Sequence, residues 1–158
     1  MKPRDDVTLR LLDPAETPPT ALLLLGDESE TMIGKYVSNA DILIAENGSV
    51  IIGVCAIAEN TPTTGEIKNI AVAEDHQGRG IGMQLLQHAI MLARQKGYVT
   101  LEIATGNSGI GQLYLYQKAG FEMTGIDRNY FVENYPIPIV ENGIPCKHRV
   151  RLKMDLVP

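Results

Sequence analysis

The spacing of apolar residues predicts strands in the first half of the chain. The run Asp41–Ala58 is rich in Ile, Val and Ala and is interrupted at Glu46-Asn47-Gly48. Asn-Gly between two such runs is a strong signal for a β-hairpin. Short helical segments are expected between Thr20 and Lys35. The strands predicted in this half are Val7–Leu12, Asp41–Ala45, Val50–Ala58 and Gly65–Val72.

The second half predicts helices that alternate with strands. From Gly80 to Lys96 the apolar residues recur every three or four positions, which indicates an amphipathic helix that ends at Gly97. A second helix is expected from Ser108 to Ala119. Because the first helix connects two strands, Gly65–Val72 and Val99–Ala104, these strands should be parallel neighbours. Two more strands are predicted at Phe121–Asp127 and His148–Leu156.

Composition and charge narrow the class of protein. The 158 residues are 44% hydrophobic and 21% charged, so we expect a single domain over residues 1–158. A formal net charge of -5 argues against a non-specific nucleic-acid binder, which needs a basic face. The N-terminal apolar run Ala21–Leu25 is too short to span a membrane or to form a signal-peptide core. We therefore expect a cytoplasmic protein with no nucleic-acid and no membrane partner.

The cysteines and histidines predict neither a disulfide framework nor a metal site. Cys55 and Cys146 are too few for such a framework and are expected to be free thiols. Together with His76, His88 and His148 they offer a single Cys-x-His pair and no second pair at zinc-finger spacing. We therefore expect no bound metal.

The segment Glu74–Leu86 has three glycines at alternate positions directly before the predicted helix. The N–H groups and the dipole at a helix N-terminus favour an anion, and glycines let a phosphate approach the backbone closely. Arg79 and His76 could add contacts to such a phosphate. The alternative is a flexible turn with tight helix packing. A Walker loop would need Lys-Ser or Lys-Thr after a glycine, and a dinucleotide fingerprint would need a third glycine where Met83 stands.

Two motifs together resemble the GNAT superfamily of N-acetyltransferases, over roughly residues 41–127. The segment Gln77–Gly82 is similar to that family's acyl-CoA signature, [Gln/Arg]-x-x-Gly-x-[Gly/Ala], and Leu115–Phe121 is similar to its Leu-Tyr-x-Lys-x-Gly-Phe motif. The resemblance implies an α/β (α+β) fold with a mixed central sheet of about six to seven strands, flanked by helices, in which the parallel fourth and fifth strands splay apart. It also implies transfer of an acetyl group from acetyl-CoA, the acyl-donor cosubstrate, to a primary amine.

The resemblance implies three contacts to the coenzyme. The glycine loop binds the pyrophosphate, and the exposed edge of the fourth strand pairs with the pantetheine arm. Asn107, after the fifth strand, holds the pantetheine or acetyl region, although it could equally be a turn or helix-cap residue. The coenzyme-binding residues expected are Ile70, Ala71, Val72, Gln77, Gly78, Arg79, Gly80, Ile81, Gly82 and Asn107.

Tyr116 occupies the motif position from which family members donate a proton to the coenzyme A sulfur. Tyr114 lies two residues earlier, about 200° around a helix, so both rings cannot face the cofactor. The spacing to Gly120-Phe121 favours Tyr116, whereas the spacing from Asn107 favours Tyr114. A core tyrosine with a satisfied hydroxyl is the alternative for Tyr116.

Glu66 begins the predicted fourth strand, where several family members carry a glutamate general base. The resemblance implies that Glu66 removes the ammonium proton, directly or through water. A solvent-facing residue at the end of a strand is an equal alternative. Strict alternation groups Glu66 with Lys68, Ile70 and Val72 on a mixed face, so periodicity favours neither alternative. A bulge in this strand would change the grouping.

The long connection Asp127–His148 is expected to bind a positively charged amine, because long connections in compact domains tend to bind something. Its aromatic rings could pack against an alkyl stem or face a cation, and its carboxylates could hold an ammonium. The acceptor-binding residues expected are Tyr130, Phe131, Glu133 and Tyr135, with Asp127 and Glu141 as further carboxylates. A solvated loop or a homodimer contact is the alternative.

The sequence leaves the identity of the acceptor open between a small-molecule amine and a peptide amine. A catalytically silent acyl-CoA-binding or sensing module on the same fold is the second function considered. Such a module would keep the glycine loop and lose Tyr116 and Glu66, and both residues are present.

Overall fold

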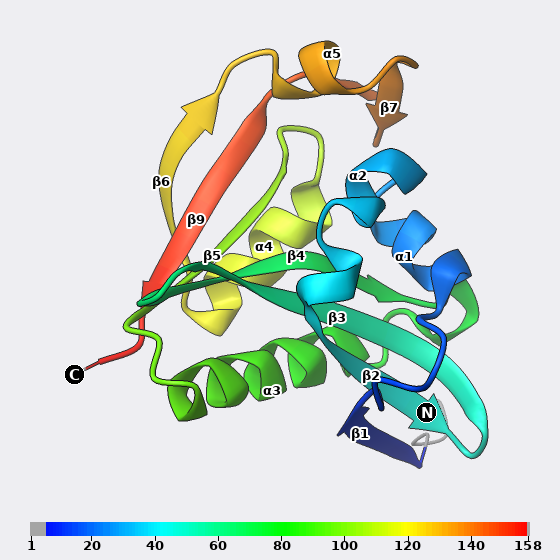
Figure 1. Ribbon diagram of the computed structural model, residues 1–158. Coiled ribbons are helices and arrows are strands. Elements are labelled where there is room, and N and C mark those ends of the chain that lie inside the picture. The colour runs from blue at the N-terminus through cyan, green and yellow to red at the C-terminus, as the bar shows by residue number, and fades with distance from the viewer. Residues whose placement is uncertain (1–5, 158) are drawn as a thin grey trace.

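The computed structural model describes residues 6–157. One large sheet comprises β1 (Val7–Leu11), β2 (Asp41–Asn47), β3 (Val50–Thr61), β4 (Thr64–Val72), β5 (Thr100–Gly106), β6 (Glu122–Asp127) and β9 (Arg149–Asp155). Its strands lie in the order β1-β2-β3-β4-β5-β9-β6 (Figure 1). Only β4 and β5 are parallel, and all other neighbours are antiparallel. The predicted mixed sheet with parallel fourth and fifth strands is confirmed.

Helices cover both faces of this sheet (Figure 1). One face carries α3 (Ile81–Gln95) and α4 (Ile110–Ala119), and the other carries α1 (Thr20–Gly26) and α2 (Glu30–Gly34). Two short 3-10 turns, η1 (Val37–Asn39) and η2 (Glu74–His76), precede β2 and the glycine loop. Within the described residues, no helix is long and apolar enough to cross a bilayer.

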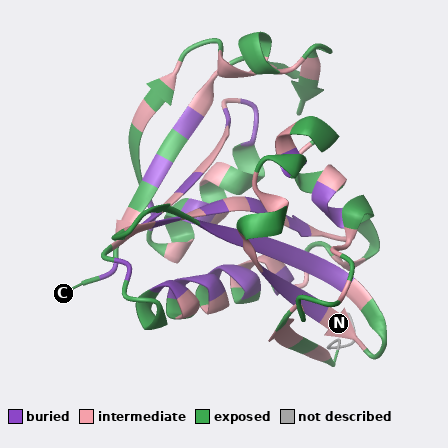
Figure 2. Cartoon of the chain, viewed as in Figure 1, coloured by how far each residue is buried: buried purple, intermediate pink, exposed green. Residues whose placement is uncertain are grey.

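The strand β3 contributes side chains to two separate apolar cores. Cys55 and Ile57 pack against α3, whereas Val54 and Ala56 pack against α1 and α2. Buried residues accordingly run along β2, β3 and the inner side of α3 (Figure 2). Because each large buried side chain contributes about 1.5–3 kcal/mol, these two cores fix the middle of the sheet.

The pairing of β4 with β5 ends halfway along β4. It runs from Thr64 opposite Thr100 to Ile67 opposite Ile103. Beyond that point β4 stays paired with β3 as far as Val72, and β5 stays paired with β9. The two parallel strands therefore separate, and one edge of β4 loses its neighbouring strand.

A β-bulge at Lys68 determines which way the side chains of β4 point. The register against β3 shifts between Ile67 and Asn69, so Lys68 is an extra residue in this strand. Ile67 packs against the α3 core before the bulge, and Ile70 packs against the same core after it. Glu66 therefore shares a face with Asn69, and the grouping of Glu66 with Ile70 by strict alternation is wrong.

The connection between β6 and β9 has secondary structure that the sequence did not predict. It contains α5 (Tyr130–Asn134) and an antiparallel hairpin of β7 (Ile139–Glu141) and β8 (Ile144–Cys146). The hairpin turns at Asn142-Gly143, where φ is 55° and 71°. These elements are too short to produce a helical or strand period in the sequence.

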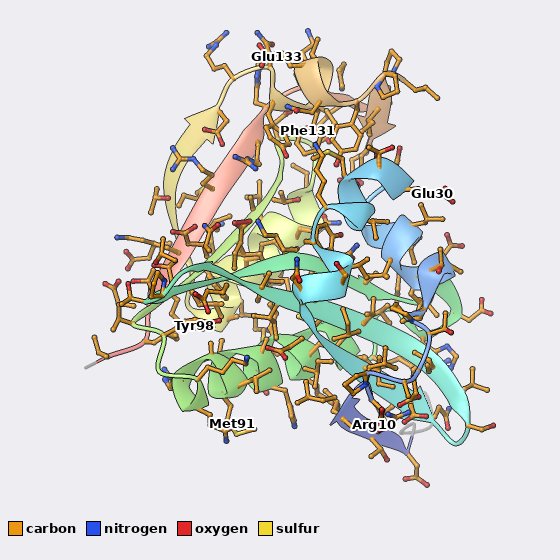
Figure 3. The ribbon with its side chains drawn as sticks, viewed as in Figure 1. Arg10, Glu30, Met91, Tyr98, Phe131 and Glu133 are labelled. Atoms are coloured by element: carbon orange, nitrogen blue, oxygen red, sulfur yellow. The ribbon has the colours of Figure 1, made fainter. Side chains whose placement is uncertain are left out.

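We expect Leu85→Ala to lower the free energy of unfolding by about 2–5 kcal/mol, because Leu85 is fully buried under the sheet. Met91→Ala is the matched control on the same helix, since Met91 is 48% exposed and points away from the sheet (Figure 3). It should change the free energy of unfolding by less than about 1 kcal/mol. Urea denaturation measures both variants, and equal losses would contradict this packing of α3.

Candidate active site

A cleft of about 1170 Å³ opens where β4 and β5 separate. Its walls come from the end of α1, from β4, from the loop before α3, from α4 and from α5. It brings together Glu66, Ile70, Ala71, Val72, Gln77, Gly78, Gly80, Gly82, Tyr116, Tyr130, Phe131 and Tyr135. The residues predicted for the site that do not line this cleft are Arg79, Ile81, Asn107, Asp127 and Glu133.

The glycine loop leaves open space in front of its backbone. Gly78 and Gly80 have φ values of 75° and 82°, which favour glycine. Apart from the adjacent residues, no atom of residues 6–157 lies within 4 Å of a Cβ placed at either position. None of the described side chains caps the N-terminus of α3. Within the described residues, the N–H groups of Ile81, Gly82 and Met83 have no acceptor. The loop therefore has the room and the donors that a phosphate needs.

Other parts of this segment have structural roles. The side chain of Ile81 is 3% exposed and packs in the α3 core, so only its N–H group is available. A Cβ at Gly82 would lie 3.3 Å from Leu115 Cδ2, so this glycine allows α3 and α4 to approach each other. Gln77 Nε2 donates to Val72 O at 3.0 Å and fastens the loop to the end of β4. Arg79 is half-buried beside the loop.

His76 lies at the cleft next to the glycine loop. Its Nδ1 atom is buried and has no hydrogen-bond partner within residues 6–157. A buried polar atom without a partner is unusual in a folded protein. Its position at the cleft is consistent with the phosphate contact expected for His76.

The two tyrosines of α4 lie in different environments. Tyr116 is 4% exposed and packs edge-on against Phe121, whereas Tyr114 is 66% exposed beneath Lys118. Burial raises the pKa of the Tyr116 phenol well above its usual value, and Glu141 and Cys55 raise it further. In the described part of the chain, the Tyr116 hydroxyl has no hydrogen-bond partner that would satisfy it. The interpretation of Tyr116 as a core tyrosine with a satisfied hydroxyl is therefore not supported.

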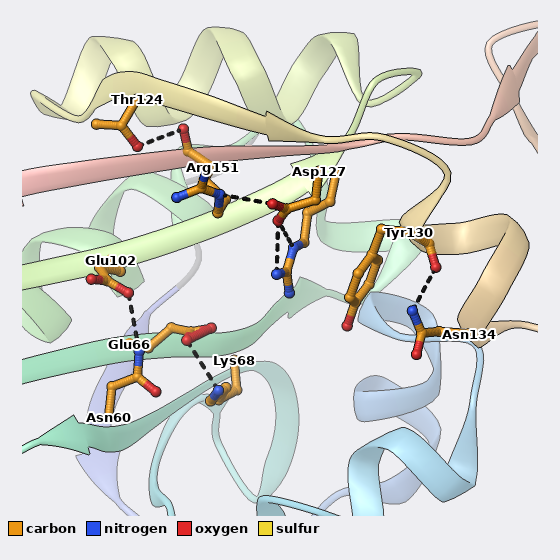
Figure 4. A network of polar contacts seen from close by, with 10 residues as sticks. Asn60, Glu66, Lys68, Glu102, Thr124, Asp127, Tyr130, Asn134 and Arg151 are labelled. Atoms are coloured by element: carbon orange, nitrogen blue, oxygen red, sulfur yellow. Dashed lines mark hydrogen bonds and ion pairs between the residues drawn. The ribbon is translucent and has the colours of Figure 1, made fainter.

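Glu66 lies at the start of the splay, and its side chain is 18% exposed. Its Oε1 atom accepts a hydrogen bond from Lys68 Nζ at 3.0 Å (Figure 4). The two residues are two apart in β4, at the bulge in this strand. Glu66 thus faces the cleft with a cation beside it, and the alternative of a purely solvent-facing residue is not supported.

Asn107 holds two parts of the chain together and does not line the cleft. Its Oδ1 atom accepts from the N–H groups of Lys147 and His148 at 2.8 and 2.9 Å, and its Nδ2 atom donates to Pro145 O at 3.1 Å. All of its side-chain hydrogen bonds thus go to the segment before β9. The contact to the pantetheine or acetyl region that the resemblance implied for Asn107 is therefore not supported.

The connection Asp127–His148 contributes aromatic rings to the cleft, but its carboxylates are placed differently from the prediction. Arg149 and Arg151 both hydrogen-bond Asp127, and these contacts lower the pKa of that carboxyl (Figure 4). The guanidinium of Arg149 lies 3.9 Å from the centre of the Tyr130 ring. Glu133 points outward from α5, away from the cleft (Figure 3). Asp127, Tyr130 and Glu133 are therefore unsuited to hold an ammonium.

Three residues at the cleft were missed by the sequence reasoning: Asp27, Tyr36 and Asn69. Asn69 is 4% exposed in the middle of β4, and its Nδ2 atom donates to Leu23 O at 2.8 Å and to Tyr36 Oη at 3.0 Å. An asparagine in the middle of a predicted strand was a signal, because asparagine is depleted in strands. No comparable signal existed for Asp27 or Tyr36.

Among residues 6–157, no group of three or more His, Cys, Asp or Glu side chains could hold a metal ion. Cys55 and Cys146 are both free thiols. Cys146 lies at the cleft, whereas Cys55 is fully buried in the α3 core, and burial raises its pKa to about 12.

Residues 12–121 match the sequence model of the Acetyltransferase (GNAT) family. The chain belongs to the GNAT family. This finding confirms the family that the two motifs predicted. Because the matched region runs from the end of β1 to the end of α4, it includes β4, the glycine loop and Tyr116.

Several relatives of this GNAT chain are similar over almost their whole length. The uncharacterized N-acetyltransferase YvbK of Bacillus subtilis is 44% identical over 135 residues, which cover 85% of this chain and 87% of YvbK. A GNAT family acetyltransferase from Elizabethkingia anophelis, solved with acetyl-CoA bound, is 45% identical with a TM-score of 0.92, over 96% of this chain and 99% of its own. An IAA acetyltransferase from Bacillus cereus is 45% identical with a TM-score of 0.91, over 95% and 99%.

Proposed function

We propose that this GNAT protein is an N-acetyltransferase that moves the acetyl group of acetyl-CoA to a primary amine within a ternary complex. The amine nitrogen forms a bond to the carbonyl carbon of the thioester, and the carbon–sulfur bond breaks. The nitrogen loses a proton and the sulfur gains one, so that the products are an N-acetyl amine and coenzyme A. The observation that carries the proposal is the uncapped, open glycine loop beside the unpaired edge of β4.

Acetyl-CoA, when bound, supplies an activated acetyl group. The free N–H groups at the start of α3, with Gly78 and Gly80 in front of them, suit the pyrophosphate. The edge of β4 from Ile70 to Val72 offers backbone groups to the amides of the pantetheine arm, as an added strand would. The acetyl-CoA bound to the E. anophelis relative supports this assignment.

Tyr116 is the proton donor in this proposal. Its side chain faces the cleft, and its raised pKa keeps the phenol protonated through the neutral pH range. Tyr114 also lines the cleft, but it is 66% exposed and therefore less suited, because water competes for its hydroxyl. Burial therefore favours Tyr116 over Tyr114.

Glu66 is the general base in this proposal, directly or through one water molecule. Its side chain lines the cleft next to the point where β4 and β5 separate, in the part of β4 that is still paired with β5. Lys68 lies beside it, with Nζ 3.0 Å from Glu66 Oε1, and holds the carboxylate at this edge of the cleft. The presence of both Glu66 and Tyr116 at the cleft favours an enzyme over a silent acyl-CoA-binding module.

We expect Gly80→Ala to weaken coenzyme A binding about tenfold or more, because the new Cβ occupies the space in front of the loop amides. Gly48→Ala is the matched control, since Gly48 has a φ of 62° in the turn between β2 and β3 and open space around it. Both variants should lose about 1 kcal/mol of stability or more, because alanine is strained at positive φ. Titration calorimetry that finds unchanged affinity in folded Gly80→Ala would refute the loop assignment.

We expect Tyr116→Phe to lower kcat about 100-fold while the KM for acetyl-CoA changes less than about threefold, because the lost hydroxyl acts on the leaving sulfur. Tyr114→Phe, the control on the same helix, should change kcat less than about twofold. Release of free thiol with a panel of primary amines measures both variants. A loss confined to Tyr114→Phe would assign the proton donor to Tyr114.

We expect Glu66→Gln to lower kcat/KM for the amine and to remove the acidic limb of its pH profile. The limb arises because protonation of Glu66 abolishes the base at low pH, and glutamine has no proton to gain or lose in this range. Glu59→Gln, an exposed carboxylate at the same cleft, is the control that removes the same charge. An acidic limb that persists in Glu66→Gln would show that another group, or the ionisation of the amine itself, determines it.

A further inference from the structure

The ionisable side chains of the cleft are predominantly acidic. Two of the cations at the cleft are already paired, Lys68 with Glu66 and Arg149 with Asp127. The described lining holds five carboxylates, Asp27, Glu28, Glu59, Glu66 and Glu141, and three cations, Lys35, Lys68 and Arg149. A cleft with an excess of negative charge attracts a cationic ligand.

Asp27 carries a charge that the protein does not neutralise. It is the half-buried C-cap of α1, where the helix dipole disfavours a carboxylate, and the last turn of α1 has no basic residue. Its Oδ1 atom accepts hydrogen bonds from Tyr135 Oη at 2.7 Å and from Ser29 N at 3.2 Å. Among residues 6–157 no cation lies within ion-pair distance of Asp27. Partly buried charges in proteins are usually paired with an opposite charge, whereas the partners of Asp27 among the described residues are two neutral hydrogen-bond donors.

Asn69 fixes the position of Asp27. Its hydrogen bond to Leu23 O holds the last turn of α1, and Asp27 directly follows this helix as its C-cap. A Cβ at Gly26 would collide with Asn69 Oδ1, so the glycine is needed for the helix to lie this close to β4. The second hydrogen bond of Asn69, to Tyr36 Oη, places a tyrosine beside the same end of α1.

Aromatic side chains lie near the Asp27 carboxylate. Tyr135 contacts it through the hydroxyl, and the ring of Phe131 lies 5.3 Å from that of Tyr135. Burial raises the pKa of Tyr36 to about 12 and raises the pKa of Tyr135 further, with the Asp27 contact as a second cause. Both phenols therefore stay protonated and neutral at physiological pH. A carboxylate flanked by neutral aromatic rings is a favourable environment for an ammonium group.

We propose that the acceptor is a diamine-like cation whose second, non-reacting ammonium binds the Asp27 cluster, formed by Asp27, Tyr36, Asn69 and Tyr135. This inference rests on the proposed N-acetyltransferase function. The reacting nitrogen must lose its proton before it attacks, and contact with a carboxylate would raise the pKa of that ammonium by about 1–3 units. Asp27, which has no cation beside it among the described residues, therefore suits a cation that keeps its charge throughout the reaction. Glu66, which is already paired with Lys68, serves the nitrogen that is acetylated.

The test compares 1,4-diaminobutane with butylamine, which has the same carbon chain and no second ammonium. We expect the wild-type chain to have a kcat/KM at least about tenfold higher for the diamine, mainly through a lower KM. Asp27→Asn keeps the shape of the side chain and removes its charge. We therefore expect this variant to have about the same kcat/KM for the two amines, with the KM for acetyl-CoA unchanged. Glu28→Gln, the adjacent cleft carboxylate, removes the same charge and should retain the preference.

A second variant tests the geometry separately from the charge. Tyr135→Phe keeps the ring and removes the hydrogen bond to Asp27, so the KM for the diamine should rise about threefold while kcat stays the same. Acetylation of both amines at equal kcat/KM, or a preference that survives in Asp27→Asn, would overturn the inference and leave the N-acetyltransferase function intact. A wild-type chain that binds acetyl-CoA but acetylates neither amine, nor any other primary amine of the panel, would overturn both.

Discussion

The separation of β4 from β5 after Ile67 is the constraint on which the rest of the site depends. Unpaired backbone groups inside a sheet are unfavourable, so a sheet interrupted in its middle needs another partner at that edge. The interruption is stable because each strand keeps its outer neighbour, β3 on one side and β9 on the other. The cleft, the glycine loop at the end of β4 and Tyr116 on α4 all adjoin this gap.

The bulge at Lys68 determines which side chains of β4 point to each face of the sheet beside this gap. If Lys68 took a regular place in the ladder, strict alternation would put Glu66 on the same face as Ile70, toward the apolar α3 core. With the bulge, Glu66 and Asn69 both point to the α1 face, where the cleft has its polar wall. One residue in one strand thus places the proposed base and the anchor of α1 on the same side of the sheet.

The sequence predicted features that depend on local pattern, and it missed those that depend on contacts between distant segments. The hairpin turn at Asn47-Gly48, the amphipathic α3 and the parallel crossover followed from short-range signals. The contact between Asp27 and Tyr135 joins residues 108 positions apart, and no local period encodes it.

Asn107 and Glu133 show a second limit of the sequence reasoning. Their residue types suited the roles expected, but the side chain of Asn107 is engaged by the segment before β9 and that of Glu133 points outward from a short helix. The fold and the open shape of the glycine loop were therefore more predictable than the wall that is proposed to face the acceptor. That wall is built from α1, α5 and the centre of β4, which come together only in three dimensions.

The environment of Tyr116 also bears on how a buried phenol can protonate a thiolate. A phenol whose pKa has been raised is a weak acid, and transfer of its proton to a water-exposed thiolate of pKa about 8.5 would be unfavourable. The same core shows what burial does to a thiol, since it raises the pKa of Cys55 to about 12. In the proposed reaction, a thiolate that left beside Tyr116, away from water, would be made more basic in the same way, so the two pKa values would move up together. On this proposal, burial keeps the phenol protonated until the sulfur needs the proton, without making the transfer itself unfavourable.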